Sequence, residues 1–510
     1  MKLRYILIIT CLTATLTAAA QKMTIGTCHM PGGGEYNGEM VGGKPYGKGK
    51  TVWKDGDVFE GEYVKGKRQG YGTYTFADGE RYEGQWMQDH QHGQGTFYFA
   101  NNNKYVGLWY RDVQEGHGVM YYYNGDTYDG DWKEDKRHGR GRYTYKSGAW
   151  YDGEWQNDKK HGRGKYDWGD GSSYDGQWRD NHQHGKGTFQ YANGDIYVGQ
   201  FQNDLQHGRG IYKFQNGDSY EGEWMQDHQH GRGIFYYSNN NRYDGLWYRD
   251  DREGHGVMYY FNGDKYDGGW RADQRHGQGT YTFKGGAFYR GEWRQDKKNG
   301  HGLFDWGDGS SYDGQWQNDH QQGKGTYRYA NGDVYVGQFQ NDMQHGRGIY
   351  TFQNGDVYEG DYANGQRTGQ GIFRYANGDK YTGQFLNGDK SGQGMLVRKS
   401  GDTYQGEWKK DKLNGKAKVT YKSGDQIEGQ FSNGQPHGEC VARYADGSKF
   451  KGHFRNGKRN GPAIEEDKEG KRFEGTYVDD KRDGRFIEKD RNGNIIAKGS
   501  YVRGRRQLDR

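Results

Sequence analysis

Aliphatic residues are scarce in this sequence. Only 31% of its 510 residues are apolar, and 91 glycines, 46 tyrosines and 15 tryptophans account for much of the composition. So few aliphatic side chains exclude several globular domains with thick cores. Disorder is also excluded, because aromatic residues make up 16% of the chain and its charges nearly balance. The chain is therefore predicted to fold around a thin, aromatic core.

Cysteine is rare and the net charge is small. The three cysteines are Cys11, Cys28 and Cys440, which do not form the pattern of a disulfide framework. The net charge is +5, and the segment from Lys451 onward holds 17 basic against 11 acidic residues, a balance of +6. Nucleic-acid binders carry a stronger and more focused positive charge. We therefore expect no nucleic-acid partner, and the basic C-terminal segment mildly favours an anionic neighbour.

The first twenty residues differ in composition from the rest. Lys2 and Arg4 precede an apolar run that ends near Leu16 and is followed by three alanines. This order is typical of a secretory signal peptide, so we predict that residues 1–20 are removed and that Gln21 begins the mature chain. A membrane anchor is the alternative, but the run is shorter than the ~20 apolar residues that a span requires. The protein is therefore predicted to be exported, to the periplasm, the cell envelope or the extracellular space.

From Tyr36 onward the sequence repeats every 23 residues, and twenty units follow in one frame without insertion or deletion. We number each unit from the residue equivalent to Tyr82. Positions 3 and 12 are glycine in all twenty copies, and position 21 is glycine in eighteen, the exceptions being Asn102 and Asn240. Asparagine is the other residue type that tolerates a positive φ at modest cost. Position 21 is therefore predicted to be a left-handed turn residue.

Each unit is predicted to be a β-hairpin. Pairs such as Asn193-Gly194, placed between aromatic runs, are strong hairpin signals. We expect a short strand at positions 1–5, a longer turn at positions 6–13, a second strand at positions 14–18 and a tight turn at positions 19–22. Alternation along the strands then gives one aromatic and one polar face. Glycine between two aromatic residues leaves a flat site over which a neighbouring ring can lie.

The anchors of each unit form the series Tyr-x-Gly-x-Trp followed by Gly-x-Gly, and this series resembles the MORN repeat. The match covers roughly residues 36–477. The resemblance implies an all-β fold, an elongated single-layer antiparallel sheet of stacked 23-residue β-hairpins that forms a rod. It also implies roles in scaffolding, dimerisation and phospholipid association. The anchors of two clear copies are Tyr82, Gly84, Trp86, Gly93 and Gly95, and Tyr220, Gly222, Trp224, Gly231 and Gly233.

Larger divisions are visible above the single unit. Residues 82–219 and 220–357 are near copies offset by 138 residues, or six units, so a special feature of one block should occur twice. Residues 21–35 precede the first unit and are predicted to be an N-terminal cap. Residues 36–403 are the regular repeats. Residues 404–510 are predicted to be degenerate repeats and a C-terminal cap, because glycine is replaced at position 14 there.

No group of residues is arranged like an active site, so the chain is predicted to be non-enzymatic. Nine of the 18 histidines occupy position 11. Equivalent positions of adjacent hairpins lie roughly 9–10 Å apart, which is too far for two histidines to share a zinc ion. We interpret these histidines as turn residues beside the required glycine, and weak metal binding by pairs such as His90 and His92 is the alternative. Neither a metal nor a cofactor is predicted.

The aromatic rings at positions 1, 5, 16 and 18, which we call the aromatic ladder, are the remaining functional candidate. They are either the core or a stacking platform for a ligand, and both apply if one edge stays accessible. Our first hypothesis is a scaffold that presents its surface to a protein partner or to itself. The alternative is a module that binds glycans or phospholipid headgroups. The tryptophans of the possible binding ladder are Trp86, Trp109, Trp132, Trp155 and Trp178.

The area of the aromatic ladder bears on assembly. Large aromatic side chains bury ~150–250 Å² each, so a bare face of twenty units would expose on the order of thousands of Å². Soluble monomers tolerate roughly a few hundred Å² in one patch. The segment at positions 6–13 is short and polar, and we expect it to cover the ladder incompletely. The sequence therefore predicts a homodimer that pairs the aromatic faces or the ends of two rods.

Overall fold

The computed structural model describes residues 22–508 of the chain. These residues form β-strands joined by turns, and the one helical element among them is the 3-10 turn η1, Pro31–Gly33. The predicted signal peptide, residues 1–20, lies outside the described residues. The all-β fold predicted from the sequence is confirmed.

The chain divides into two compact units. The first comprises Met1–Ser238 and Trp247–Asp250, and the second comprises Asn239–Leu246 and Asp251–Arg510. The first unit contains β1 (Thr24–Met30), β2 (Gly34–Val41), β3 (Lys44–Val52), β4 (Val58–Val64), β5 (Lys67–Thr75), β6 (Arg81–Met87), β7 (His90–Tyr98), β8 (Lys104–Tyr110), β9 (Val113–Tyr121), β10 (Thr127–Lys133), β11 (Lys136–Thr144), β12 (Trp150–Gln156), β13 (Lys159–Asp167), β14 (Ser173–Arg179), β15 (His182–Gln190), β16 (Ile196–Gln202), β17 (Leu205–Lys213), β18 (Ser219–Met225) and β19 (His228–Tyr236).

Strand β20 (Arg242–Tyr248) has residues in both units. The strands that follow it in the second unit are β21 (Asp251–Tyr259), β22 (Lys265–Arg271), β23 (Gln274–Thr282), β24 (Phe288–Arg294), β25 (Lys297–Asp305), β26 (Ser311–Gln317), β27 (His320–Arg328), β28 (Val334–Gln340), β29 (Met343–Thr351), β30 (Val357–Ala363), β31 (Gln366–Arg374), β32 (Lys380–Leu386), β33 (Asp389–Val397), β34 (Thr403–Lys409), β35 (Lys412–Thr420), β36 (Gln426–Ser432), β37 (Gln435–Arg443), β38 (Lys449–Arg455), β39 (Lys458–Glu466), β40 (Arg472–Val478), β41 (Lys481–Arg482), β42 (Gly484–Lys489), β43 (Ile495–Val502) and β44 (Arg505–Leu508).

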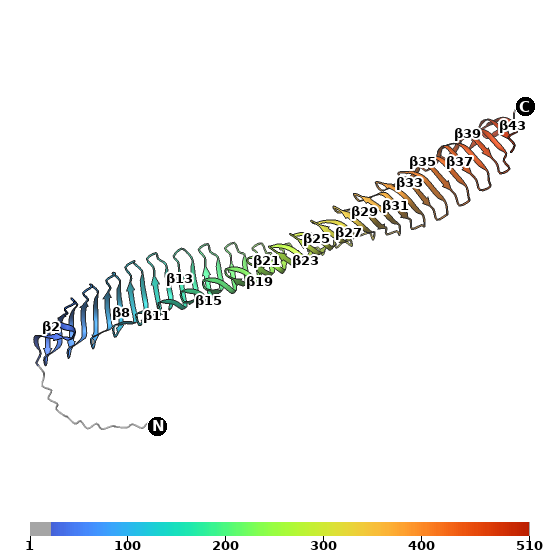
Figure 1. The fold of residues 1–510 in the computed structure, drawn as a ribbon. Coiled ribbons are helices and arrows are strands. Elements are labelled where there is room, and N and C mark those ends of the chain that lie inside the picture. Colours follow the sequence, from blue (N-terminus) through green and yellow to red (C-terminus); the bar gives the residue numbers. More distant parts are fainter. Residues whose placement is uncertain (1–21, 509–510) are drawn as a thin grey trace, which may run out of the picture. The chain divides into compact units, whose positions relative to one another are not determined.

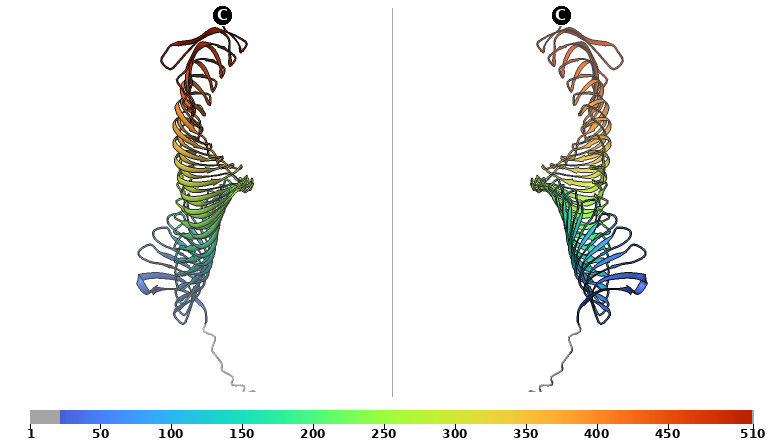
Figure 2. Two further views of the ribbon diagram at one scale, coloured as in Figure 1. Left: turned by 90° about the vertical axis from the view of Figure 1, so that its right-hand side faces the viewer. Right: turned by 90° about the vertical axis from the view of Figure 1, so that its left-hand side faces the viewer.

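Within each unit, consecutive strands pair in antiparallel fashion, as Figure 1 shows along the chain. In one hairpin, β6 and β7 place Tyr82 opposite Phe97 and Gly84 opposite Gly95. The register continues into the next hairpin, where β7 and β8 place Gly95 opposite Gly107. Each unit is a single layer with no helix on either face among residues 22–508 (Figure 2). The predicted antiparallel sheet of 23-residue hairpins is therefore confirmed.

The tight turn of each hairpin lies in a different place from the one predicted. β6 and β7 are joined by two residues, Gln88 and Asp89, whose φ angles are 54° and 74°. Two positive φ angles define the type I′ turn that suits the twist of a hairpin. The expected long turn at positions 6–13 is therefore wrong, because positions 9–13 already belong to the second strand. The connection that contains position 21 is the longer one, and the N–H of Phe99 donates to the carbonyl of Asn103 across it at 3.0 Å.

A β-bulge explains the glycine at position 12. After the pair Gly84 and Gly95, the register shifts so that Trp86 lies opposite Gln91. Gly93 lies within the bulge at a φ of +64°, and a Cβ atom there would lie 1.9 Å from Oε1 of Gln85. Both the backbone conformation and the space therefore require glycine.

The glycines at positions 3 and 14 are required for a different reason. The ring of Tyr82 lies across its own hairpin, and its hydroxyl donates to the carbonyl of Gln85 at 2.9 Å. A Cβ atom on Gly84 would lie 2.5 Å from the Cα of Gly95, and one on Gly95 would lie 2.3 Å from the Tyr82 hydroxyl. The prediction that glycine makes room for a ring is confirmed, and the ring belongs to the same hairpin.

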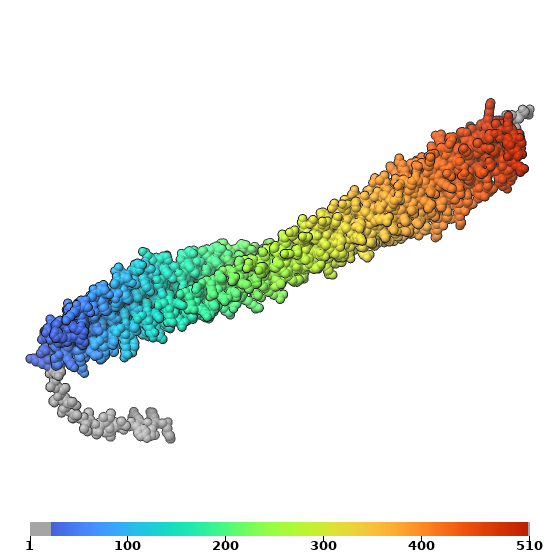
Figure 3. Space-filling view, viewed as in Figure 1, coloured from blue at the N-terminus to red at the C-terminus, as the bar shows by residue number. Residues whose placement is uncertain are grey.

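Tyrosine and tryptophan rings link one hairpin to the next. Tyr82 forms edge-to-face contacts with Trp86 of its own hairpin and with Trp109 of the next, both with centroids 5.3 Å apart. The indole N–H of Trp86 donates to the carbonyl of Gly72 in the preceding hairpin at 3.2 Å. Tyr82 is fully buried. On the visible face, consecutive hairpins of each unit pack together without gaps (Figure 3).

Aspartates at position 22 bridge the five-residue turns of neighbouring hairpins. Oδ2 of Asp126 accepts a hydrogen bond from the Tyr143 hydroxyl at 2.8 Å, and Oδ1 accepts one from the backbone N–H of Lys146 at 2.9 Å. Desolvation alone would raise the pKa of Asp126, but the hydrogen bonds from Lys146, Tyr143 and Asn124 outweigh it and lower the pKa. The carboxylate is therefore held charged in a partly buried position.

The last strands of the second unit depart from the regular hairpin. β40 pairs both with the two-residue strand β41 and with β42. The Arg482 guanidinium lies 3.8 Å from the centroid of the Phe473 ring, and Arg506 forms an ion pair of 2.6 Å with the buried Glu488. Cation–π and ionic contacts therefore close this end of the core.

The turn at position 21 makes a first prediction. Gly194 has a φ of +93°, and a Cβ atom there would meet no atom closer than 3.6 Å, so any penalty is conformational. Gly194→Val is expected to destabilise the hairpin by about 1–2 kcal/mol, because a β-branched residue is strained in the left-handed region. Gly194→Asn is the matched control, since Asn102 and Asn240 occupy this position at 64° and 66°. Hydrogen exchange in β15 and β16, with thermal unfolding, measures the difference, and equal values for the two variants would contradict the turn.

The buried tyrosines make a second prediction. Burial raises the pKa of Tyr82, Tyr105 and Tyr128 above the usual range. Because the folded pKa exceeds the unfolded value of about 10, these residues stabilise the fold below that pH, and the stabilisation is lost as the pH rises toward the folded pKa. Tyrosinate absorbance from the core is therefore expected to appear together with loss of the β-sheet circular dichroism. Complete tyrosine ionisation in a chain that keeps its β signal would contradict this prediction.

Candidate interaction groove

The structure places the predicted anchors in the core of each hairpin. Tyr82 and Tyr220 are fully buried, and each ring lies over the two glycines at positions 3 and 14 of its hairpin. Gly231 repeats the bulge of Gly93, at a φ of +59°. Trp224 donates its indole N–H to the carbonyl of Gly210 in the preceding hairpin at 3.3 Å. The remaining anchors with this structural role are Gly84, Trp86, Gly95, Gly222 and Gly233.

The possible binding ladder is buried within the single chain. The exposed fractions of its five tryptophans lie between 4% and 6%. A stacking platform for a ligand needs an open ring face, and such small exposed fractions leave none. The members are Trp86, Trp109, Trp132, Trp155 and Trp178.

Side chains at position 10 of the preceding unit cover the indoles. The Arg68 guanidinium lies 4.3 Å from the centroid of Trp86, and the Lys160 ammonium lies 4.5 Å from that of Trp178. Desolvation lowers the pKa of Lys160 to about 8. A second chain is therefore not needed to cover the ladder, contrary to the prediction, because side chains of the same chain already cover the rings.

Two of the five tryptophans of the possible binding ladder have a neutral neighbour instead. Position 10 is Gln91 before Trp109 and Gln114 before Trp132, and the two glutamines are 6% and 5% exposed. Among residues 22–508, no cation–π contact reaches either tryptophan, and the indole N–H of Trp109 is buried without a hydrogen-bond partner. This stretch of the ladder therefore lacks the positive charge found on both sides of it.

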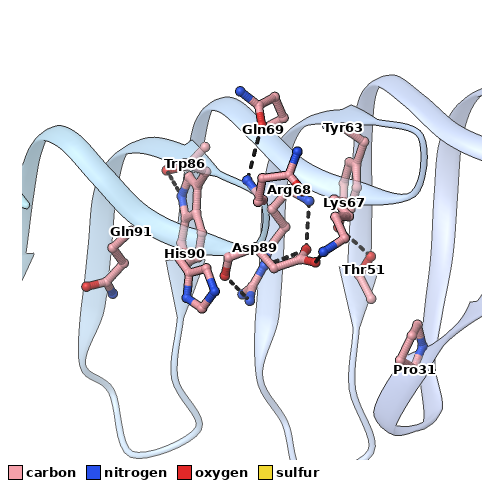
Figure 4. A network of polar contacts seen from close by, with 12 residues as sticks. Pro31, Thr51, Tyr63, Lys67, Arg68, Gln69, Trp86, Asp89, His90 and Gln91 are labelled. Carbon is pink, nitrogen blue, oxygen red and sulfur yellow. Dashed lines mark hydrogen bonds and ion pairs between the residues drawn. The ribbon is translucent and has the colours of Figure 1, made fainter. Parts of the chain in front are cut away.

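Aspartates at position 8 form a rim beside the two-residue turns. Oδ1 of Asp89 accepts a hydrogen bond from the backbone N–H of Arg68 at 2.8 Å, and Nη2 of Arg68 donates to the Asp89 carbonyl at 2.8 Å (Figure 4). Asp112 likewise accepts from the N–H of Gln91 at 2.7 Å, and its Oδ2 lies 2.5 Å from Nδ1 of His90. These carboxylates bridge adjacent hairpins and remain partly exposed at the surface.

A groove of 1160 Å³ lies along this part of the first unit. Its lining includes the buried Trp109, Met120 and Trp132, and the half-buried rings of Phe99 and Tyr122 on the side of the five-residue turns. The aspartate rim lines the other side. The groove therefore combines an apolar, aromatic side with a carboxylate side.

The groove carries a negative charge. Four aspartates and two arginines line it, which leaves two negative charges when His90 is neutral. Ion pairs neutralise the two ends, because Arg68 lies 3.6 Å from Asp89 and Arg137 lies 3.0 Å from Asp158. The uncompensated negative charge therefore lies in the middle of the groove. The charged residues in order along the chain are Arg68, Asp89, Asp112, Asp135, Arg137 and Asp158.

The middle carboxylates are the least compensated of the groove. Oδ1 of Asp135 accepts a hydrogen bond from the N–H of Gln114 at 2.8 Å, and no ion pair to Asp135 occurs within residues 22–508. Asp112 has His90 as its ionic partner. The substitution of glutamine for arginine or lysine at position 10 therefore creates the local excess of negative charge.

Sequence reasoning missed this groove. Positions 8 and 10 lie inside the segment that was predicted to be a loose polar turn, and the structure puts position 10 in a strand. The signals that could have found it are the aspartate that recurs at position 8 and the alternation of arginine, lysine and glutamine at position 10. His92, predicted to be a turn residue, also lies in a strand, β7, opposite Tyr110.

Two further properties concern the described residues as a whole. No group of three or more histidine, cysteine, aspartate or glutamate side chains is placed to hold a metal ion among residues 22–508. No helix in this part of the chain is long and apolar enough to cross a membrane.

Solved structures give only weak similarities. The TCP domain of SAS-4 from Drosophila melanogaster, solved with a proline-rich motif of Ana2, is 14% identical and covers 31% of this chain and 85% of its own, with a TM-score of 0.21. The TCP10 domain of CPAP from Danio rerio, solved with a STIL peptide, is 9% identical and covers 60% of this chain and 99% of its own, with a TM-score of 0.19. Similarities this weak carry no argument about function.

Comparison with curated sequences finds no match. The model of the MORN repeat, in contrast, matches nineteen successive segments between residues 36 and 472. Their boundaries follow the 23-residue frame, and each hairpin described above lies within that frame. From its repeated hairpins and these nineteen matches, the chain belongs to the MORN repeat family.

Proposed function

We propose that this protein is an exported, non-enzymatic scaffold that binds a protein partner in the groove between Arg68 and Asp158. The observation that carries the proposal is the groove itself, with an aromatic side and a carboxylate rim. Repeats of this family generally serve as scaffolds, and the regular hairpins of residues 36–403 repeat an aromatic residue at position 1 and glycines at positions 3 and 14. Export rests on the signal-peptide pattern of residues 1–20.

The chemistry of the groove favours a polypeptide that carries both apolar and basic side chains. Apolar side chains suit the half-buried rings of Phe99 and Tyr122. Lysine or arginine side chains suit Asp112 and Asp135, where the chain supplies no arginine or lysine of its own. Electrostatic complementarity of this kind raises association rates and selects partners.

The alternative ligands fit less well. A phospholipid headgroup presents a phosphate, which the carboxylates of Asp112 and Asp135 would repel. A glycan that stacks on tryptophan needs open indole faces, and those of Trp109 and Trp132 are buried. Binding of a protein partner is therefore the function that the groove supports best. Binding of a glycan or a phospholipid headgroup is the second candidate.

Removal of the two central charges tests this proposal. Asp112→Asn with Asp135→Asn keeps an oxygen that accepts the backbone hydrogen bond, as Asn181 does at the same position with the N–H of Lys160 at 2.8 Å. We expect the fold to be unchanged and capture of a protein from envelope extract to weaken by roughly tenfold, or ~1.4 kcal/mol. Capture by the wild type should also weaken as salt is added.

The controls separate the ligand classes. Asp273→Asn with Asp296→Asn makes the same change where Arg252 and Arg275 already pair with the carboxylates, at 2.8 and 3.0 Å, and should leave capture intact. Purified glycans and liposomes are tested in parallel with the same variants. Binding to either of these, with no groove-dependent capture of protein, would replace the proposal by the second candidate.

A further inference from the structure

We infer that the N-terminal edge of the sheet is a self-association surface, on which β1 of one chain pairs with β1 of a second copy. β1, Thr24–Met30, pairs with β2 along one edge. Among residues 22–508, no strand pairs with its other edge. That edge therefore presents a row of unpaired backbone N–H and C=O groups, which is a template for another strand.

The repeat frame explains why this edge is incomplete. Gly26 lies opposite Gly38, as Gly72 lies opposite Gly84 between later hairpins. β1 therefore occupies the place of the second strand of a hairpin. Residues 1–20, which precede this strand, are the predicted signal peptide, so the inference rests on the export that we propose above.

The two terminal strands differ in how they are protected. β1 holds no lysine, arginine, aspartate, glutamate or proline, and the side chain of Ile25 is 84% exposed. The last described strand, β44, is four residues long and includes Arg505 and Arg506. Short strands and positive charges are the usual protection against edge pairing, and β1 has neither. The asymmetry favours pairing of two N-terminal edges over pairing of an N-terminal with a C-terminal edge.

Two-fold symmetry makes the β1 sequence complementary to itself. In an antiparallel pair whose axis passes through Thr27, all seven residues of β1 overlap. Ile25 then lies beside His29 of the partner subunit, and Gly26 beside Cys28 of the partner subunit. Residues that face each other come from the same side of the sheet, so each aromatic core continues on the same face. No two charged side chains lie opposite each other in this register, so the occupant that fits the edge is a second copy of the chain.

The test uses opposite charges at the symmetry axis. The full chain, expressed with its own leader and purified, is expected to show a concentration-dependent dimer by light scattering. Thr27→Lys and Thr27→Glu should each be monomeric where the wild type is dimeric, because two like charges would face each other. An equimolar mixture of the two variants should form the dimer again. Gln507→Lys, in β44, is the matched control and should leave the dimer unchanged.

Cross-linking provides a second measurement that does not depend on weakening the dimer. In a Cys28→Ser background, Thr27→Cys should form a disulfide-linked dimer under oxidising conditions, since opposed residues of paired strands lie within disulfide reach. Ile25→Cys in the same background is the control, and it should cross-link poorly because two such residues would be four positions out of register.

The outcomes are distinct. A wild-type monomer at the highest accessible concentration, a dimer that persists in both charged variants, or the absence of a Thr27→Cys cross-link would each overturn the inference. If a charged variant fails to fold by circular dichroism, the cross-link decides. The β1 pairing does not use the groove, so Asp112→Asn with Asp135→Asn should leave the dimer intact. A failure of partner capture and a failure of dimerisation are thus observed separately.

Discussion

The contact on which the regular hairpins of residues 36–403 depend is the aromatic ring at position 1 lying across the glycines at positions 3 and 14. In the hairpin of Tyr82, a Cβ atom on either Gly84 or Gly95 would overlap the opposing backbone or the ring. The same ring meets Trp86 and, in the next hairpin, Trp109. One contact therefore determines both the interior of a hairpin and its stacking on the next. In this way each unit obtains a core with few aliphatic residues.

The charge of the surface depends on which side chains cover the tryptophans. Where position 10 is Arg68 or Arg137, its cation lies over an indole and also pairs with the aspartate at position 8. Where position 10 is Gln91 or Gln114, the ring is still buried but Asp112 and Asp135 have no arginine or lysine partner. A substitution that is conservative for packing thus changes the local charge, and a repeated core can present different surfaces along its length.

A sheet built by adding identical hairpins has no internal means of ending. The C-terminal end is closed by contacts that occur once, such as Arg482 over Phe473 and Arg506 with Glu488. At the other end, the first strand of the described residues is β1, which is uncharged and takes the place of half a hairpin. The difference between the ends is a property of the terminal strands alone, because the hairpins between them share one geometry.

The sequence by itself determined the repeat, the hairpins, the aromatic core and the positive φ at position 21, because each depends on residues close together in one unit. It did not determine which turn is the tight one, since Gln88 and Asp89 adopt positive φ angles without glycine and the bulge at Gly93 moves the start of the second strand. The burial of the ladder and the groove were decided by the tertiary structure alone. Positions 5, 8 and 10 meet only when one hairpin lies on the next, so contacts between units, and not the pattern within one, bring Trp109, Gln91 and Asp112 to the same surface.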